Sequence, residues 1–291
     1  GKLFGSSVRT GTGYTGFMLG AGWYDATQGP GTEKVCSDDL FAYERDTGHL
    51  AWRYAGGVII NTTLAIGDGR VYLVESRNPE IKASESRRIG SAQLWADQYL
   101  VALDADGGAK CWEQKLSVEP GIAAFYLIHS GGALVLASSA SGKYHLSCFA
   151  ASDGRLRWTA SQAWLGADHG AHIQHPVVVG DRAFLMPFGY DMKTGAVVTD
   201  KMPRGACGTV AATTRALIYR VKPHVSLWDF AAGKLSSWPT LRPSCWISTI
   251  PAGGMVLSPE GGGGCSCGGF LEVSCGFLPK PSGESRPEAE R

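Results

Sequence analysis

Histidine and cysteine side chains gather in a few short segments of the sequence. The segment DHGAHIQHP places a histidine at every third position, and GGGGCSCGG carries two cysteines inside a glycine-rich run. Imidazole nitrogens and thiolates are ligands that Zn²⁺ and copper prefer. The candidate metal ligands are His169, His172, His175, Cys207, Cys245, Cys265 and Cys267.

The cysteines have a second interpretation. The chain contains 8 of them, an even number, as expected of an exported protein with disulfide bonds. The two cysteines of the CSC motif stand too close to pair with each other, so each would need a partner such as Cys245 or Cys275. Cys111 and Cys148 fall inside strands, where we expect buried thiols. Disulfides or inert thiols are the favoured interpretation, and the metal site is the alternative.

Five polar turns indicate the framework that positions these residues. Each turn follows an aliphatic strand and closes on glycine, and the turns read FAYERDTGHLAW, VALDADGGAKCW, SCFAASDGRLRW, GYDMKTGAVV and LWDFAAGKLSSW. The turn glycines are Gly48, Gly108, Gly154, Gly195 and Gly233. Tryptophan follows four of them, at Trp52, Trp112, Trp158 and Trp238. The residues that open the turns are Glu44, Asp104, Ala150, Asp191 and Asp229, all acidic except Ala150.

Each residue type in this repeated turn has a structural role. Glycine adopts the positive φ that ends a tight turn, and the carboxylate accepts hydrogen bonds from the amides of its own turn. The tryptophan begins the returning strand, where it can fill the wedge between neighbouring sheets. The spacing of the glycines brackets the roughly 40 to 50 residues of a four-stranded propeller blade.

A second hairpin recurs between these turns. The segments NTTLAIGDGRVYLVES, FYLIHSGGALVLASS, QHPVVVGDRAFLMPF, TVAATTRALIYRV and STIPAGGMVLSPE align so that Arg70, Ala133, Arg182, Ala216 and Met255 share one column. Each repeat therefore contains four strands, with hairpins joining the first to the second and the third to the fourth. Helical spacing is limited to a turn or two within residues 80–95.

The repeats predict an all-β fold, a β-propeller of four-stranded antiparallel blades with about five to six blades. An ordinary β-sandwich would explain the strands but not the column of turns. We expect one propeller over residues 1–280, followed by a disordered tail rich in Pro and Glu over 281–291. Its expected parts are an incomplete first blade at 1–57, four complete blades at 58–239 and an incomplete last blade at 240–280. The chain either closes into a ring or forms the C-terminal arc of a longer propeller, and we expect it to be part of a longer protein.

The alignment also suggests where the candidate ligands converge. The innermost strands are expected to begin near Thr62, Ala124, Gln174, Gly208 and Ile247. His175 then lies at the start of an innermost strand, and Cys207 and Cys245 stand close to the same column in the following repeats. That end of a strand lines the central channel or its mouth. We therefore expect the histidines and cysteines to approach one another there, where Trp246 could stack on a planar ligand.

Composition narrows the function classes. The chain has 291 residues, of which 44% are hydrophobic and 18% charged, so it can bury a large core. A formal net charge of +1 without a basic run argues against nucleic acid as a partner. No apolar stretch reaches the length of a transmembrane helix.

The turn consensus resembles the pyrroloquinoline quinone (PQQ) repeat of quinoprotein alcohol dehydrogenase-like β-propellers, from about Asp39 to Pro239. Three further segments are similar to uncharacterised PQQ-like propeller proteins of planctomycete-type bacteria. They read VESRNPEIKASESRRIG, QHPVVVGDRAFL and RPSCWISTIPAGGMVLSPEGGGGCSC. The resemblance implies a propeller fold and an extracytoplasmic, bacterial setting.

The resemblance does not imply that this chain binds PQQ. Quinoprotein dehydrogenases of this superfamily hold PQQ against a disulfide of two adjacent cysteines, and this chain has no adjacent pair, so PQQ binding is not expected. The favoured function is a non-catalytic platform that binds a protein or a small-molecule ligand at the propeller face. The alternative is a metal-dependent or quinoprotein-type oxidoreductase with its site at the channel mouth.

Overall fold

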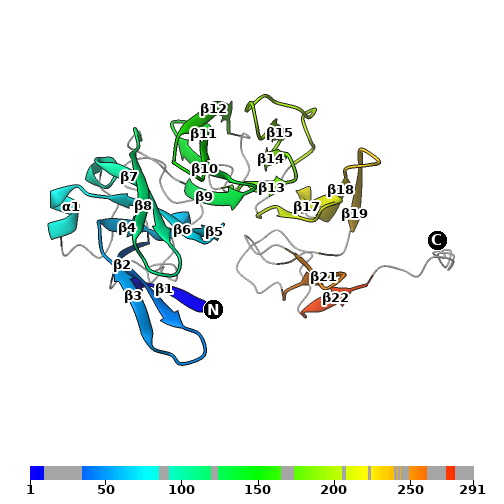
Figure 1. Cartoon of the computed structure of the whole chain (residues 1–291). Helices are drawn as coiled ribbons and strands as arrows, with labels where there is room; N and C mark the ends of the chain where they lie inside the picture. The colour runs from blue at the N-terminus through cyan, green and yellow to red at the C-terminus, as the bar shows by residue number, and fades with distance from the viewer. Residues whose placement is uncertain are drawn as a thin grey trace, which may run out of the picture. The chain divides into compact units, whose positions relative to one another are not determined.

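The computed structural model describes residues 1–9, 35–84, 92–118, 124–164, 174–204, 208–221, 224–238, 241, 243, 249–260 and 273–278. Strands dominate the described residues, and every pairing between these strands is antiparallel (Figure 1). The chain divides into two compact units, Gly1–Met202 and Pro203–Arg291. The all-β class expected from the sequence is confirmed.

The first unit holds four groups of strands, which we call the first to fourth blades. They are β1–β3, β5–β8, β9–β12 and β13–β15. The bounds in the first two blades are β1 Lys2–Val8, β2 Cys36–Glu44, β3 Leu50–Tyr54, β5 Ala65–Gly67, β6 Arg70–Ser76, β7 Gln98–Asp104 and β8 Lys110–Lys115. The bounds in the third and fourth are β9 Ala124–Ser130, β10 Ala133–Ala140, β11 Lys143–Ala150, β12 Leu156–Ala163, β13 Val177–Val179, β14 Arg182–Leu185 and β15 Phe188–Asp191.

The second unit holds two further groups, the fifth blade β16–β19 and the sixth β20–β22. The bounds are β16 Ala211–Ala212, β17 Ala216–Val221, β18 His224–Asp229, β19 Lys234–Trp238, β20 Ile250–Ala252, β21 Met255–Ser258 and β22 Cys275–Phe277. Among the described residues of this unit, Ile218, Val225 and Leu241 form a buried apolar cluster.

One short strand departs from the expectation of separate four-stranded blades. Strand β4 (Val58–Ile60) pairs with β2 on one side and β6 on the other. It therefore joins the first and second blades into a single eight-stranded sheet, in the order β1-β2-β4-β6-β7-β8 with β3 on β2 and β5 on β6. Its three aliphatic side chains are fully buried. Burial of this apolar link and the pairing of its backbone on both sides explain why it takes a sheet position.

The strand columns read from the sequence are confirmed. Strands β6, β10, β14, β17 and β21 begin at the aligned residues Arg70, Ala133, Arg182, Ala216 and Met255. The limited helix expected within residues 80–95 is present as α1 (Pro79–Ala83) and the 3₁₀ turn η3 (Ala92–Trp95). A second 3₁₀ turn, η2 (Asn61–Thr63), precedes β5, so that strand starts at Ala65 rather than near Thr62.

The turn glycines adopt the conformation that the repeat requires. All five have positive φ, from 59° at Gly233 to 74° at Gly154. The Asp191 Oδ1 atom accepts hydrogen bonds from the amides of Lys193 and Thr194, at 2.9 and 2.8 Å. Asp104 and Asp229 accept bonds from their own turns in the same way. Glu44 differs, because its longer side chain binds Lys2 instead, at 2.6 Å.

Each tryptophan that follows a turn in the first three blades packs on the turn of the next blade. The Trp52 Nε1 atom donates to the Ala105 carbonyl at 3.1 Å, and Trp112 and Trp158 donate in the same way to Ala151 (3.1 Å) and Met192 (2.9 Å). The acceptors directly follow Asp104, Ala150 and Asp191. A Cβ atom at Gly108, Gly154 or Gly195 would come within 2.6 Å of the docked indole ring. The tryptophans thus fill the wedge between blades, as expected, and the turn glycine is needed for space as well as for φ.

The edge strands of successive blades in the first unit contact one another. Strand β9 of the third blade contacts β5 of the second and β13 of the fourth. Each of these is the first strand of its blade and pairs with one strand only. This order of contacts is the one expected if the first strand of each blade is innermost.

Candidate functional site

Most of the candidate metal ligands lie outside the described residues. They are His169, His172, Cys207, Cys245, Cys265 and Cys267, together with Trp246. Within the described ranges, no group of three or more His, Cys, Asp or Glu side chains is arranged to hold a metal ion. Convergence of the histidines and cysteines therefore stays a prediction.

His175 is the one candidate ligand within the described residues. Its Nδ1 atom lies 2.6 Å from the Pro176 carbonyl oxygen, and its ring lies 4.6 Å from that of Tyr126. Because a carbonyl only accepts, Nδ1 carries the proton, and Nε2 of the neutral ring keeps its lone pair. Burial lowers the pKa of His175, which favours this neutral form. In this tautomer Nε2 is unprotonated, as it must be if His175 binds a metal ion through that atom.

The described cysteines are Cys36, Cys111, Cys148 and Cys275, and the last three are free thiols. Cys148 is buried as expected, and burial raises the pKa of its thiol to about 11. The expectation for Cys111 was wrong, because its side chain is exposed. It lies on β8, the outer strand of the eight-stranded sheet, where part of the strand faces solvent.

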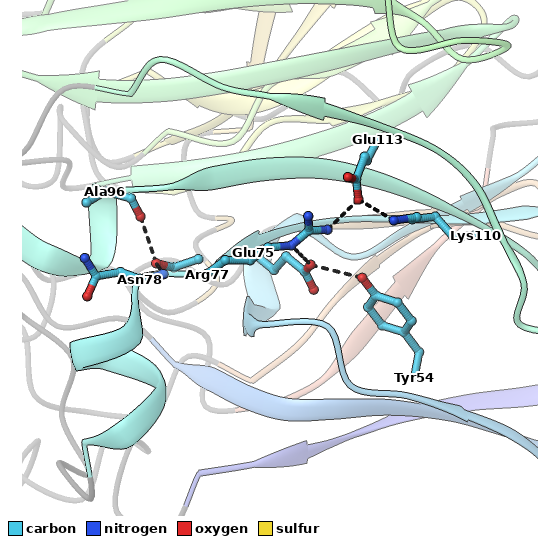
Figure 2. Close-up of polar contacts among 8 residues, drawn as sticks. Tyr54, Glu75, Arg77, Asn78, Ala96, Lys110 and Glu113 are labelled. Atoms are coloured by element: carbon cyan, nitrogen blue, oxygen red, sulfur yellow. Dashed lines mark hydrogen bonds and ion pairs between the residues drawn. The ribbon is translucent and has the colours of Figure 1, made fainter.

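A network of charged side chains joins the first two blades. It consists of Tyr54, Glu75, Arg77, Lys110 and Glu113, which we call the Glu75 network (Figure 2). The Glu75 Oε1 atom accepts hydrogen bonds from the Tyr54 hydroxyl at 3.0 Å and from Arg77 Nε at 2.8 Å. The Oε2 atom of Glu113 accepts from Arg77 Nη2 at 2.6 Å and from Lys110 Nζ at 2.7 Å. Arg77 therefore bridges two carboxylates, one fully buried and one partly exposed.

These contacts fix the protonation states within the network. Burial and the neighbouring Glu75 carboxylate raise the pKa of Tyr54, so its hydroxyl stays protonated and donates. Hydrogen bonds from Arg77 and Lys110 lower the pKa of Glu113 to about 2. The hydrogen bond to Glu113 also raises the pKa of Arg77. Arg77 and Glu113 therefore form an ion pair at neutral pH.

Glycines cover the buried carboxylate. A Cβ atom at Gly56 would lie 2.1 Å from the Tyr54 hydroxyl oxygen and 2.7 Å from Glu75 Oε1. At Gly57 it would lie 2.6 Å from the carbonyl oxygen of Ser76. The backbone between β3 and β4 can approach Glu75 this closely only because both residues lack side chains.

The network stands at the start of a long connection, residues 77–97, which joins β6 to β7 of the second blade. The Arg77 amide donates to the Asp97 carbonyl at 3.0 Å, and the Ser76 hydroxyl donates to the Ala96 carbonyl at 2.9 Å. Arg9 holds α1 from the side of β1, because its Nη1 atom donates to the carbonyls of Ile81 and Ser84 at 3.1 and 3.0 Å. The connection is therefore fixed at its root and at α1.

Two aromatic contacts extend this region. The Arg77 guanidinium lies 4.0 Å from the centre of the Tyr99 ring, and Lys115 Nζ lies 5.9 Å from it. Lys115 also pairs with Asp97 at 2.9 Å. Cations over an aromatic face hold the ring in place and leave a polar, partly exposed surface beside the connection.

The sequence analysis did not identify the Glu75 network. The partners come from strands β3, β6 and β8, so their spacing along the chain carries no pattern. One signal was present, since Glu75 interrupts the otherwise apolar run VYLVES of a strand expected to be buried. A charged residue at such a position needs a partner, and this pointed to an ion pair without naming its members.

The comparisons with known proteins agree with the strand arrangement. Residues 96–201 match the protein-family model described as outer membrane protein assembly factor BamB. BamB from Moraxella catarrhalis has a similar structure, with a TM-score of 0.53 and 16% identity over 82% of this chain and 71% of that one. No curated protein matches the chain.

Two other solved structures are similar. The computationally designed Ika8 protein has a TM-score of 0.52 and 11% identity, over 84% of this chain and 67% of its own. The exotype rhamnogalacturonan lyase YesX has a TM-score of 0.52 and 16% identity, over 88% of this chain and 52% of its own. At these identities the likeness shows the fold alone.

The repeated antiparallel blades and these neighbours define the chain as a β-propeller protein. The match over residues 96–201, together with the turn columns, makes the repeats in that part of the chain those of the PQQ type. Among the described residues, no helix is long and apolar enough to cross a membrane.

Proposed function

We propose that this protein is a non-catalytic, extracytoplasmic platform that binds another protein through the connection at residues 77–97. The fold supports this, because the similar BamB is by its name an assembly factor for outer membrane proteins. The proposal for this chain rests on its own geometry, since fold alone does not fix function.

The observation that carries the proposal is the anchored connection itself. The corresponding links in the third to fifth blades are short, with only residues 141–142 between β10 and β11, 186–187 between β14 and β15, and 222–223 between β17 and β18. The second blade instead carries a long excursion with its own helix, whose buried Ile81 is its apolar anchor. Loops of this length on a rigid scaffold commonly carry binding function.

At α1 and at its ends, the described parts of the connection are held in one conformation. Ordering each backbone residue costs about 1–2 kcal/mol, and the Arg9 and Ser76 bonds offset only part of that cost. A surface that is already ordered loses less entropy when a partner binds. Glu80 and Lys82, which are exposed on α1, are available for polar contacts with a partner.

A photocrosslinking residue at Lys82 tests the proposal in cells that produce the protein. The same residue at Arg155, exposed in a turn of the third blade, is the matched control. We expect a discrete protein adduct from position 82 that is absent at 155. Equal labelling at both positions would contradict the proposed surface, and alcohol oxidation by the purified chain supplied with PQQ and Ca²⁺ would contradict the non-catalytic role.

A metal-dependent activity is the second candidate, and the tautomer of His175 favours it. A neutral imidazole with its Nδ1 proton donated to a carbonyl is the usual arrangement of a histidine that binds metal through Nε2. Elemental analysis of the purified protein tests this idea. Stoichiometric zinc or copper that is lost in His175→Ala would support it, and the same metal content in both proteins would count against it.

A further inference from the structure

One side chain of the first blade reaches α1 in the connection of the second blade. Arg9 directly follows β1, and its amide donates to the Cys36 carbonyl of β2 at 2.9 Å. Its Nη1 atom donates to the carbonyls of Ile81 and Ser84 at 3.1 and 3.0 Å, and its Nη2 atom to that of Lys82 at 3.4 Å. These three carbonyls belong to the end of α1 and its C-cap, so a single guanidinium binds the C-terminal end of the helix.

The same guanidinium is fixed on the side of the first blade. Its Nε atom donates to Asp38 Oδ1 of β2 at 2.7 Å. The Arg9 side chain is only 9% exposed, whereas that of Asp38 is 57% exposed. The donors of a guanidinium point in fixed directions within one plane, so Arg9 can bind a carboxylate and a set of carbonyls at once. Arg9 therefore ties α1 to β2.

The helix α1 has few other contacts that hold it. It spans five residues, and a helix of this length is not stable by itself in water. Its N-terminal end is capped from within the connection, because Asn78 Oδ1 accepts from the amides of Glu80 and Ile81 at 3.0 and 3.2 Å. Ile81 is its buried residue. The carbonyls at a helix C-terminus lack partners within the helix and favour a nearby cation, and here Arg9 of another blade supplies both.

We propose that Arg9 controls whether α1 is folded, and that loss of its contacts removes the surface through which the partner binds. The second part of this proposal rests on the proposed function, and the first part does not. Without the guanidinium, only the Asn78 cap and the burial of Ile81 act on the helix. Binding must then also order the connection, which weakens it. The effect is local, because Arg77 holds the start of the connection through bonds that do not involve Arg9.

Hydrogen exchange followed by mass spectrometry tests the first part. In Arg9→Ala we expect the amides of residues 80–84 to exchange about tenfold faster than in the wild type or more, and those of β6 and β7 to keep their rates. Arg45→Ala is the matched control, because this arginine of the same blade is 64% exposed and pairs only with the adjacent Asp46. The control should exchange as the wild type does.

A second variant covers the case in which Arg9→Ala also loosens β1 and β2. Arg9→Lys keeps the positive charge, but an ammonium cannot bond the Asp38 carboxylate and three carbonyls at once. We expect residues 80–84 to exchange faster than in the wild type here too, with the strands unchanged. Wild-type exchange of residues 80–84 in both variants would overturn the proposal, because the Asn78 cap and Ile81 would then suffice to hold α1.

The photocrosslinking residue at position 82 tests the second part. We expect its adduct to decrease severalfold when Arg9→Ala is added and to stay the same when Arg45→Ala is added. An undiminished adduct from a protein whose α1 exchanges faster would overturn the control of binding by Arg9. No adduct from the wild-type background would instead contradict the proposed function, and the exchange rates would still decide whether Arg9 holds α1.

Discussion

At the level of single residues, the turn glycines serve two purposes that can be separated. Gly154 and Gly142 both have positive φ, at 74° and 78°. A Cβ atom at Gly154 would lie 2.5 Å from the Trp112 ring, whereas the space beside Gly142 is open. Alanine at either position must adopt a strained positive φ, which costs about 1–3 kcal/mol. We expect Gly154→Ala to lower the melting temperature clearly more than Gly142→Ala, because only the first also displaces a tryptophan.

Equal melting temperatures for these two variants would show that the indole moves aside without cost. Tryptophan fluorescence of Gly154→Ala gives a direct check. A ring displaced from its turn should emit at longer wavelength than in Gly142→Ala.

Glu113 should make the stability depend on pH in the acid range. Hydrogen bonds from Arg77 and Lys110 lower its pKa from 4.5 to about 2 in the folded protein. A carboxyl whose pKa is lower when folded contributes stability above its unfolded pKa, and this contribution is lost as the pH falls toward the folded value. We therefore expect wild type to lose more stability between pH 4.5 and 2 than Glu113→Gln does.

Urea midpoints measured across that range give the comparison. Asp106→Asn, at an exposed turn residue, is the control and should follow the wild-type curve. Parallel curves for wild type and Glu113→Gln would show that the ion pairs in the Glu75 network do not contribute to stability.

The sequence predicted those residues whose role depends only on the chain within a few positions of them. The positive φ of the turn glycines follows from chain geometry within a few residues, and so do the bonds that Asp191 accepts from its own turn. Glu75 is different, because its partners Tyr54 and Arg77 satisfy a buried charge across strands. Cys111 was placed wrongly because strand alternation does not show which strand lies at a sheet edge.

At the level of elements, the tryptophan on the last strand of a blade links it to the next. Trp158 Nε1 donates to the Met192 carbonyl at 2.9 Å, and both groups are buried. Trp158→Phe keeps most of the apolar contact but leaves that carbonyl with only the weak contact from the Cys148 thiol at 4.0 Å, so we expect a loss of about 1 kcal/mol. Trp158→Ala should cost about 3–5 kcal/mol, because it also leaves a cavity.

Urea denaturation of the three proteins measures these differences. Trp238→Phe is the control. We expect this variant to change the free energy of unfolding little, because Trp238 is partly exposed. A Trp158→Phe variant as stable as wild type would mean that the hydrogen bond contributes nothing beyond ring packing.

Element positions were predicted well where a repeat could be aligned. The five second strands begin at the aligned column from Arg70 to Met255, since their hairpins recur with the same turn chemistry. Strand β4 was not expected, because it occurs once and has no counterpart to align. The convergence of His175 with the cysteines depends on connections whose course no local rule gives, so it remains a prediction.

At the level of the whole molecule, the two units differ in the size of their apolar cores. Among the described residues, those of the first unit form large buried clusters that run between its blades, whereas those of the second include a cluster of three buried residues. Less buried apolar surface gives less protection against opening. We expect amides of β17 and β18 to exchange with solvent faster than those of β10 and β11, although both are paired strands.

Hydrogen exchange followed by mass spectrometry resolves these segments. The comparison needs peptides within Ala216–Asp229 and within Ala133–Ala150. One common free energy of opening for both would show that the chain unfolds as a single cooperative body and would contradict the expectation.

The contact between a tryptophan and the turn of the next blade also has a consequence for the order in which its two partners are synthesised. Synthesis runs from the N-terminus, so Trp112 is made before Gly154 and Trp158 before Gly195, and each indole exists before its binding place does. In the first three blades, completion of the next blade covers the indole that the preceding blade left without a binding place.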